Sequence, residues 1–426
     1  MSGQHVIVVG GGLAGLTAAC ELARQRIAVT LLEGSGRLGG RARSTVREGT
    51  IRNLGPHALH TRGPGTAILE GLGIELPGRR PASHQARLLV DGRIVSPLER
   101  HLGGVTSAVV SLARLHRAAR SSDPDGSVAD WLEHRVPDAV ARRLLAPLVR
   151  LATYADADEQ QAADVLTEAL RAGGVRYLDG GWDALVQRLR RAASAAGTAI
   201  TAGAPVVSVR YDRAWIVTTR DGRRHVATDV IVATGGPATA ADLVVHESAA
   251  DTLQRWADRA TPGRMASLDV ALTRRPPGPP LVLGVDDPLY LSVMSDRSRI
   301  APPGGAVVQA ARFLPLGSHA PEGTRAELES LLDRALDGWR DAVIHARYLP
   351  NLTVTHDGAL ATAGGRRSRP GPAVPGVDGL YVAGDWVGTQ GTLAQAAIAS
   401  GALAARQIVE RATRGAAGSL EEAARS

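Results

Sequence analysis

The chain has 426 residues, 44% hydrophobic and 21% charged, a balance that predicts a globular protein of two or three structural units and excludes a disordered chain or a fibre. Its 49 basic and 42 acidic side chains give a formal net charge of +7, and the absence of lysine excludes any mechanism that needs a lysine amine. The scattered arginines and 3% aromatic content argue against nucleic-acid binding, while the single cysteine, Cys20, excludes an internal disulfide and a cysteine-built metal cluster.

The first 33 residues predict a βαβ unit, with strands over residues 6–9 and 27–33 and a helix over residues 13–25. Gly10, Gly12 and Gly15 form a GxGxxG pattern, which permits a tight turn, a close approach of the backbone to a pyrophosphate and close packing of the helix. The helix N-terminus, at residues 13–14 (Leu13 and Ala14), offers free N–H groups to the phosphates. Glu33 ends the second strand, where a carboxylate can accept hydrogen bonds from ribose hydroxyls, so the unit predicts a bound dinucleotide.

Residues 37–44, RLGGRARS, follow this unit almost directly. Their glycines let the backbone pass beneath a bulky cofactor, and their arginines can neutralise its diphosphate. The succession of GGGLAGL, Glu33 and RLGGRARS resembles the N-terminus of the flavin-containing amine oxidase and phytoene desaturase superfamily. This resemblance implies FAD rather than NAD, with cofactor contacts from Gly34, Arg37, Gly39, Gly40 and Arg41.

The resemblance continues in three internal segments. Residues 53–57, NLGPH, are similar to the family's loop near the flavin ring, residues 175–189 to its re-entry into the FAD domain, and residues 230–235 to its return toward the cofactor. The residues that this implies at the cofactor are Gly55, Pro56, His57, Val207, Ala233, Thr234 and Gly235.

The remaining elements follow from turn signals and hydrophobic runs. We expect a hairpin over residues 84–95 that turns at Asp91-Gly92, and helices over residues 98–172, broken at residues 123–126 and resumed with Ser127 as a cap. Next come a helix over 182–196, strands over 206–209, 215–219 and 230–233, and a turn at Asp221-Gly222 between the second and third of these strands. Strand-like runs over 264–313 precede a helix over 323–338, a strand over 380–383 and a helix over 392–410.

The last strand runs into a glycine-rich loop and a helix, an arrangement that resembles the C-terminal FAD motif of the same superfamily. In that family the aspartate holds the ribityl or diphosphate region, and the helix start faces the flavin edge where negative charge collects on reduction. The residues concerned are Gly384, Asp385, Gly391, Thr392 and Leu393.

These segments together predict an α/β fold with a discontinuous, Rossmann-like FAD-binding domain and an interleaved α+β substrate domain. We expect the FAD-binding domain over residues 1–80, 173–240 and 375–426. The substrate domain, with a helical part, is expected over residues 81–172 and 241–374.

The sequence departs from the amine oxidases of the superfamily in three ways. It lacks the lysine that many of them hold near flavin N5, and Thr392 occupies the position of one of their substrate-clamping aromatic rings. Cys20 lies far from the C-terminal motif, so the FAD is expected to be non-covalent. The desaturase-like branch therefore fits better.

The expected reaction is a two-electron oxidation of a small organic molecule, either C–C desaturation or C–N oxidation, by hydride transfer to flavin N5 and reoxidation by O₂ or another acceptor. His57, Arg312 and Trp386 are the candidate catalytic residues, with His60 and Tyr290 as further polar candidates, and no metal is required. Two alternatives remain: a non-redox flavin-dependent isomerase of the same fold, and a protein that uses FAD structurally.

The N-terminus lacks the positive start of a signal peptide, and residues 386–405 are too polar for a membrane span. Residues 98–120 are amphipathic, which fits an ordinary surface helix and leaves peripheral membrane contact open. A cytoplasmic location is expected.

Overall fold

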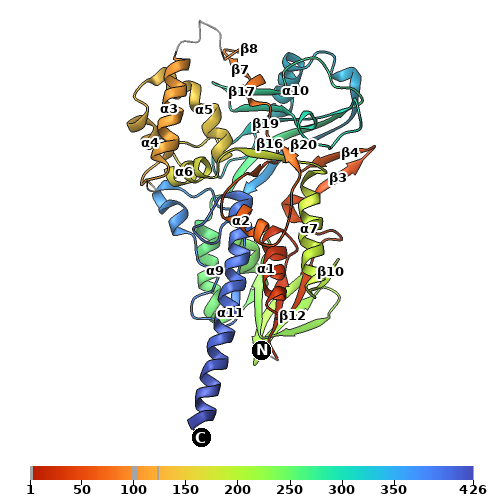
Figure 1. Ribbon diagram of the computed structural model, residues 1–426, viewed down its shortest axis with the longest axis vertical. Coiled ribbons are helices and arrows are strands. Elements are labelled where there is room, and N and C mark those ends of the chain that lie inside the picture. Colours follow the sequence, from red (N-terminus) through yellow and green to blue (C-terminus); the bar gives the residue numbers. More distant parts are fainter. Residues whose placement is uncertain (1–2, 98–103, 122–123, 426) are drawn as a thin grey trace.

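The computed structural model describes residues 3–97, 104–121 and 124–425, and side chains as far as residue 414. The molecule is elongated, with a parallel sheet and its helices at one end and a large, mostly antiparallel sheet at the other (Figure 1). Within the described ranges, no helix combines the length and apolar character needed to cross a membrane.

The parallel sheet carries the N-terminal βαβ unit. Its strand order is β10-β2-β1-β14-β21, and all neighbouring strands are parallel. The strands are β10 (Ala199–Ala202), β2 (Ala28–Glu33), β1 (His5–Val9), β14 (Asp229–Val232) and β21 (Leu380–Val382). The apolar residues of β1, β14 and β21 are buried on both faces, as their continuous hydrophobic runs predict, whereas the edge strand β10 is largely exposed.

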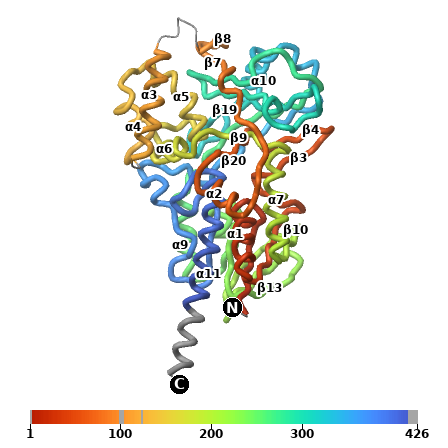
Figure 2. Tube along the Cα trace, in the orientation of Figure 1, coloured from red at the N-terminus to blue at the C-terminus, as the bar shows by residue number. Residues whose placement is uncertain are grey.

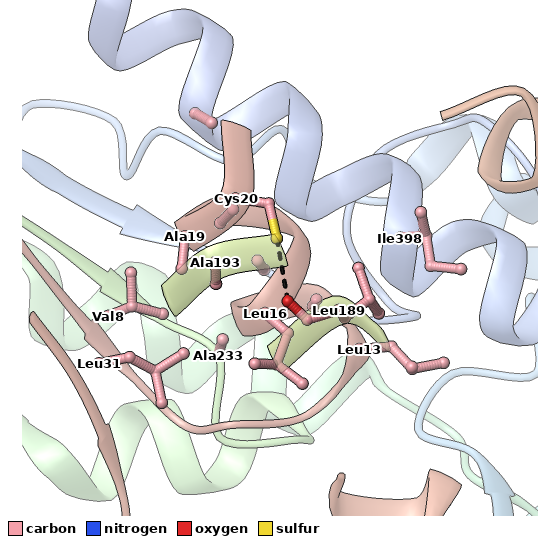
Figure 3. Close-up of a cluster of buried hydrophobic side chains, with 14 of the residues drawn as sticks. Val8, Leu13, Leu16, Ala19, Cys20, Leu31, Leu189, Ala193, Ala233 and Ile398 are labelled. Atoms are coloured by element: carbon pink, nitrogen blue, oxygen red, sulfur yellow. Dashed lines mark hydrogen bonds between the residues drawn. The ribbon is translucent and has the colours of Figure 1, made fainter. Parts of the chain in front are cut away.

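Three helices cover one face of this sheet: α1 (Leu13–Arg24), α7 (Gly181–Ala195) and α11 (Leu393–Arg425). Figure 2 shows α1, near the start of the chain, beside α11, near its end. In the core between α1 and α7 the thiol of Cys20 donates to the carbonyl of Leu189, with 3.3 Å between Sγ and O (Figure 3). Burial raises the pKa of this thiol to about 12, so Cys20 is a core residue.

The other face of the parallel sheet packs against a smaller sheet and two helices. These elements are β13 (Arg224–Ala227), β12 (Ala214–Thr219), β11 (Val206–Asp212), β15 (Val244–Val245), α8 (Pro237–Leu243) and α9 (Glu247–Arg259). The predicted turn at Asp221-Gly222 is confirmed and lies between the strands expected over 215–219 and 230–233, but it joins β12 to β13, a strand that was not predicted. The short antiparallel strand β13 contains the polar Arg224 and His225, so it lacks the hydrophobic run that would have predicted a strand.

The second end of the molecule is built on a seven-stranded sheet of order β20-β16-β19-β18-β17-β7-β8. Its strands are β20 (Val343–Thr355), β16 (Gly263–Leu272), β19 (Ala306–Phe313), β18 (Leu289–Val293), β17 (Leu281–Gly284), β7 (Arg87–Val90) and β8 (Arg93–Val95). Helix α10 (Thr324–Ala335) packs on one face through Leu328, Leu331 and Leu332. The predicted turn at Asp91-Gly92 is confirmed, since both residues have positive φ and join β7 to β8.

A helical group lies beside this sheet and comprises α3 (Val105–Ala118), α4 (Val128–Arg135), α5 (Ala139–Thr153) and α6 (Ala163–Arg171). Ser127 caps α4, as predicted: its hydroxyl accepts from the Asp130 N–H at 3.1 Å in a capping box. Residues 98–103 of the amphipathic stretch and residues 122–123 of the predicted break lie outside the described residues.

Short elements connect the two ends of the molecule. They are β3 (Ser44–Arg47), β4 (Thr50–Asn53), β5 (Leu59–His60), α2 (Pro64–Gly71), β6 (Gly78–Arg79) and β9 (Val175–Leu178). The loop between β4 and β5 contains residues 54–58 and reaches the site described next.

Candidate cofactor and substrate site

The turn between β1 and α1 has room for phosphate groups that would bind to N–H groups of the protein backbone. Gly10 has φ +108°, a conformation that favours glycine, and a Cβ on Gly15 would lie 2.0 Å from the Gly10 carbonyl oxygen. A Cβ on Gly12, in contrast, would meet no protein atom within 4 Å. Gly10 and Gly15 therefore serve the turn and the packing of α1, whereas Gly12 leaves space that faces the site.

Glu33 ends β2 beside this turn. Its carboxylate accepts from the Gly11 N–H at 2.7 Å and from the Ser35 N–H at 2.8 Å, which fixes its position. A carboxylate has about four lone-pair sites, so Glu33 retains capacity for ligand hydroxyls.

The segment after Ser35 closes over the same turn. The Gly39 N–H donates to the Gly11 carbonyl at 2.7 Å, and a Cβ on Gly40 would approach the Gly12 Cα at 3.6 Å. Arg37, which the resemblance placed at the cofactor, points elsewhere: it donates to the Ser44 carbonyl at 2.8 Å and its side chain is half exposed.

Asp385 follows β21 and is fully buried. It accepts from an Arg41 terminal nitrogen at 2.7 Å, and from both the backbone N–H and Nδ1 of His356 at 3.0 Å. Burial opposes its charge, but Arg41 and His356 outweigh that effect and hold the pKa of Asp385 well below its ordinary value. Asp385 is thus an anion in this site.

A single cavity of about 530 Å³ joins these groups. Its lining includes most of the predicted cofactor residues: Gly10, Gly12, Leu13, Ala14, Glu33, Gly34, Gly39, Gly40, Arg41, Pro56, His57, Ala233, Thr234, Gly235, Gly384, Asp385 and Leu393. Segments more than 300 residues apart in the sequence therefore meet around one space.

Other predicted residues do not line this cavity. They include Arg37, as described, and also Gly15, Gly55, Gly391 and Thr392. Val207 is 46% exposed, and the neighbouring residues Pro205 and Val206 line the cavity instead. Trp386 is buried and donates from Nε1 to the Gly235 carbonyl at 2.6 Å, which supports the wall from outside. Arg312 lies in β19 and forms an ion pair with Glu327 of α10 at 2.5 Å, away from the cavity. Neither Arg312 nor Trp386 lines the cavity, so neither is proposed as a catalytic residue.

His57 remains in the site. Its Nδ1 donates to the Gly55 carbonyl at 3.1 Å, and its ring packs edge-on against Trp182 with centroids 5.0 Å apart. Burial lowers the pKa of His57, and this effect exceeds the opposing effects of the Gly55 carbonyl and the Asp269 carboxylate. At neutral pH the ring is therefore neutral, with its lone pair on Nε2.

One part of the cavity lining is apolar and comes from segments that no local motif marked. Its residues are Tyr154, Met265, Leu352 and Val354, which pack together in one hydrophobic cluster. Tyr154 and Leu393 both have positive φ, at 56° and 54°, a strained conformation that concentrates at functional sites. Among the described residues that line the cavity, the charged side chains other than histidine are Glu33, Arg41 and Asp385. All three belong to the part of the cavity formed by the β1–α1 turn, Glu33, residues 39–41 and Asp385, here called the cradle.

The cavity fits a flavin dinucleotide on observations of its own. Thr234 Oγ1 and Trp182 Nε1 are buried at its wall without a hydrogen-bond partner in the protein, so each is available to a ligand. Gly12 leaves room for a pyrophosphate, and the first turn of α11 presents backbone N–H groups at the opposite end.

A parallel sheet with a glycine turn after its first strand and a cavity beside that turn is typical of dinucleotide-binding oxidoreductases. Residues 13–409 match the model of the flavin-containing amine oxidoreductase family, so the chain belongs to that family.

The relatives and solved structures agree with this assignment. The chain is 28% identical over 177 residues to protoporphyrinogen oxidase 2 of Arabidopsis thaliana, a match that covers 37% of this chain and 34% of that one. It is 30% identical over 282 residues to the coproporphyrinogen III oxidase of Mycobacterium tuberculosis, covering 56% of this chain and 60% of the relative. The matches thus span only part of the relatives' length. A crystal structure of an oxidoreductase from Methanosarcina mazei shares the fold, with a TM-score of 0.71, 20% identity and coverage of 96% and 100%.

Proposed function

We propose that the protein binds FAD non-covalently and oxidises an uncharged, largely apolar organic molecule by two electrons, through C–C desaturation or C–N oxidation, with O₂ or another acceptor taking the electrons. The observation that carries this proposal is the continuity of one cavity from the Gly12–Glu33 cradle to an apolar part of its lining. Bound FAD would supply a hydride acceptor at N5 and a store for two electrons.

The residues of the cradle would each contact a different part of the cofactor. Glu33 would accept from the ribose hydroxyls, the α1 N-terminus at Gly12 would meet the diphosphate, and Thr234 and Trp182 would each gain a partner. The N–H groups that begin α11 would face negative charge, which favours the reduced cofactor.

The apolar part of the cavity would bind the substrate and exclude water. No carboxylate there could hold an ammonium group, and no arginine could hold a substrate carboxylate, among the described lining residues. A charged amine or an amino acid would lose its hydration without compensation, which favours a neutral substrate. His57, neutral at neutral pH, would orient the substrate or accept a proton at Nε2.

The first test is the visible absorption spectrum of the purified protein with FAD added, before and after acid precipitation. We expect an oxidised flavin spectrum and release of all flavin into the supernatant. Absence of bound flavin would overturn the assignment, and flavin retained in the pellet would contradict non-covalent binding.

The second test is anaerobic mixing of the holoprotein with neutral compounds, such as alkenes and N-alkylanilines, and with charged ones, such as alkylamines and amino acids. The neutral, apolar compounds should bleach the flavin, and air should restore it. A flavin that stays oxidised with all of them, yet is reduced by dithionite, would favour the isomerase or the structural use of FAD.

A further inference from the structure

A row of polar side chains crosses the seven-stranded sheet on the face toward residues 53–57. Arg347 of β20 lies opposite Asp269 of β16, Asp269 lies opposite Gln309 of β19, and Gln309 lies opposite Ser292 of β18. Residues directly opposite one another share a face, so the four side chains form one line, here called the polar row. Asp269, Gln309 and Ser292 are each at most 2% exposed.

Three members of the polar row hold the backbone of the loop that carries His57. Arg347 donates to the Asn53 carbonyl, and Gln309 Nε2 donates to the Gly55 carbonyl at 2.6 Å. The Gly55 N–H points to Asp269 at 3.4 Å, a long hydrogen bond. Arg347 also pairs with Asp269 at 2.5 Å, which compensates the buried carboxylate.

Gly55 links the polar row to His57. Its carbonyl accepts from Gln309 and also from His57 Nδ1, so one oxygen joins the sheet to the imidazole. Gly55 has φ +77°, and a Cβ there would lie 2.4 Å from Leu352 Cδ2, so the loop is pressed against the sheet.

The same network reaches Trp182, the ring against which His57 packs. The Asn53 side-chain oxygen accepts from the Trp182 backbone N–H at 3.0 Å. At the other end of the polar row, Ser292 lies 3.1 Å from the hydroxyl of Tyr177, in the strand that precedes α7. Trp182, which lines the cavity beside His57, is therefore tied through Asn53 to Arg347 of the sheet, and Tyr177, which does not line the cavity, ties the strand before α7 to Ser292.

We propose that Asp269, Gln309 and Arg347 are positioning residues that place His57 and Trp182 beside the cofactor. The proposal rests on the proposed function, but it concerns only how the sheet holds the loop. Buried charge and amide groups are costly in a sheet core unless they are paired, and here their partners are the loop's own backbone groups.

The test compares Asp269→Asn and Gln309→Met in the FAD-loaded protein. FAD should still bind in equal amount, because neither residue lines the cavity, but flavin reduction at saturating substrate should slow by about 10-fold to 100-fold, as expected for a misplaced group. The imidazole signal of His57, assigned by NMR with His57→Gln, should also change. In Asp269→Asn the pKa of His57 should fall. The Asp269 carboxylate, which favours protonation of the ring, is lost, whereas the charge of Arg41, which opposes protonation, remains.

The control is Asp229→Asn. Asp229 is another fully buried aspartate paired with an arginine, Arg411, but it lies in β14 of the parallel sheet. It should lower stability without changing the His57 signal or the rate of reduction.

Unchanged rates and an unchanged His57 titration in folded Asp269→Asn and Gln309→Met would overturn the proposal. Gln309→Met removes no charge, so it is expected to fold if Asp269→Asn does not. If no substrate reduces the wild-type flavin, the proposed function fails, whereas the NMR titration still tests the polar row.

Discussion

Gly15 and Gly12 in the first glycine turn differ in the space around them, so substitutions at the two positions distinguish an effect on folding from an effect on ligand binding. A methyl group at Gly15 would collide with the Gly10 carbonyl, while one at Gly12 would enter open space. We expect Gly15→Ala to lower the free energy of unfolding by several kcal/mol or to prevent folding. Gly12→Ala should leave stability within about 0.5 kcal/mol and weaken FAD binding at least about 10-fold, as measured by fluorescence titration of the apoprotein.

Gly71 provides the matched control, since it also has open space around it but lies far from the cavity lining. Gly71→Ala, at the end of helix α2, should leave FAD affinity unchanged and raise stability by up to about 1 kcal/mol. Equal FAD affinity in Gly12→Ala and wild type would show that no ligand passes close to Gly12.

His60 makes stability depend on pH. Its side chain is 9% exposed, and burial lowers its pKa from 6.5 to about 4. The unfolded state therefore binds a proton first as pH falls, so stability present above pH 6.5 is lost toward pH 4. Between pH 7 and pH 5 we expect a loss of about 2 kcal/mol from this group.

The measurement is denaturant unfolding at both pH values for wild type and His60→Gln. The variant should lose about 2 kcal/mol less than wild type over this interval. His84→Gln, at an exposed histidine, is the control and should behave as wild type does. A His60→Gln variant with the wild-type pH dependence would contradict the buried, neutral state of His60.

At the scale of elements, the capping box of α4 gives a stability prediction. Ser127→Ala removes the acceptor for the Asp130 N–H and should cost about 1 kcal/mol in the free energy of unfolding. Ser127→Thr, which keeps a hydroxyl, should restore most of it. FAD content should be the same in all three proteins because α4 does not line the cavity, and a loss of flavin in Ser127→Ala would contradict that separation.

The elements with strong local signals were predictable from the sequence. The strands around Val8 and Leu31 are continuous apolar runs, the helix follows the glycine turn at Gly12, and Ser127 is a cap residue, so each has a signal in its own segment and each is confirmed. The strand at Arg224–Ala227 was missed because its stability comes from pairing with β12, which a polar four-residue segment does not reveal.

The same distinction explains the site. Glu33 and Asp385 sit at the ends of buried strands next to glycine turns, so sequence spacing located them. Tyr154, Met265 and Leu352 come from three separate elements that meet only after folding, and no motif announces them. Arg312 has a strand position that the sequence suggested, but its side chain faces Glu327 of α10 instead of the cavity. Trp182, beside a pair of glycines, was the one missed residue with a local signal.

For the whole molecule, the cavity predicts that both ends of FAD contribute to stability. Glu33 lies at one end of the cradle and Asp385 at the other, so a ligand that spans both would clamp distant segments together. At a free FAD concentration 1,000 times Kd, binding should add about 4 kcal/mol to the free energy of unfolding. FMN, which lacks the adenosine part, should raise the thermal unfolding midpoint much less at the same concentration, and equal shifts with FMN and FAD would contradict the role of Glu33.

The placement of β21 and α11 beside β1 and α1 also has a consequence for biosynthesis. Gly384 comes 374 residues after Gly10, yet both line the same cavity. While the ribosome is still adding the central part of the chain, the emerged N-terminal segment has a glycine turn but lacks the opposite wall of its cofactor site. Flavin uptake must therefore wait until translation has passed Leu393, and a nascent chain stalled before that point should be a poor binder of FAD, exposed to chaperones and proteases.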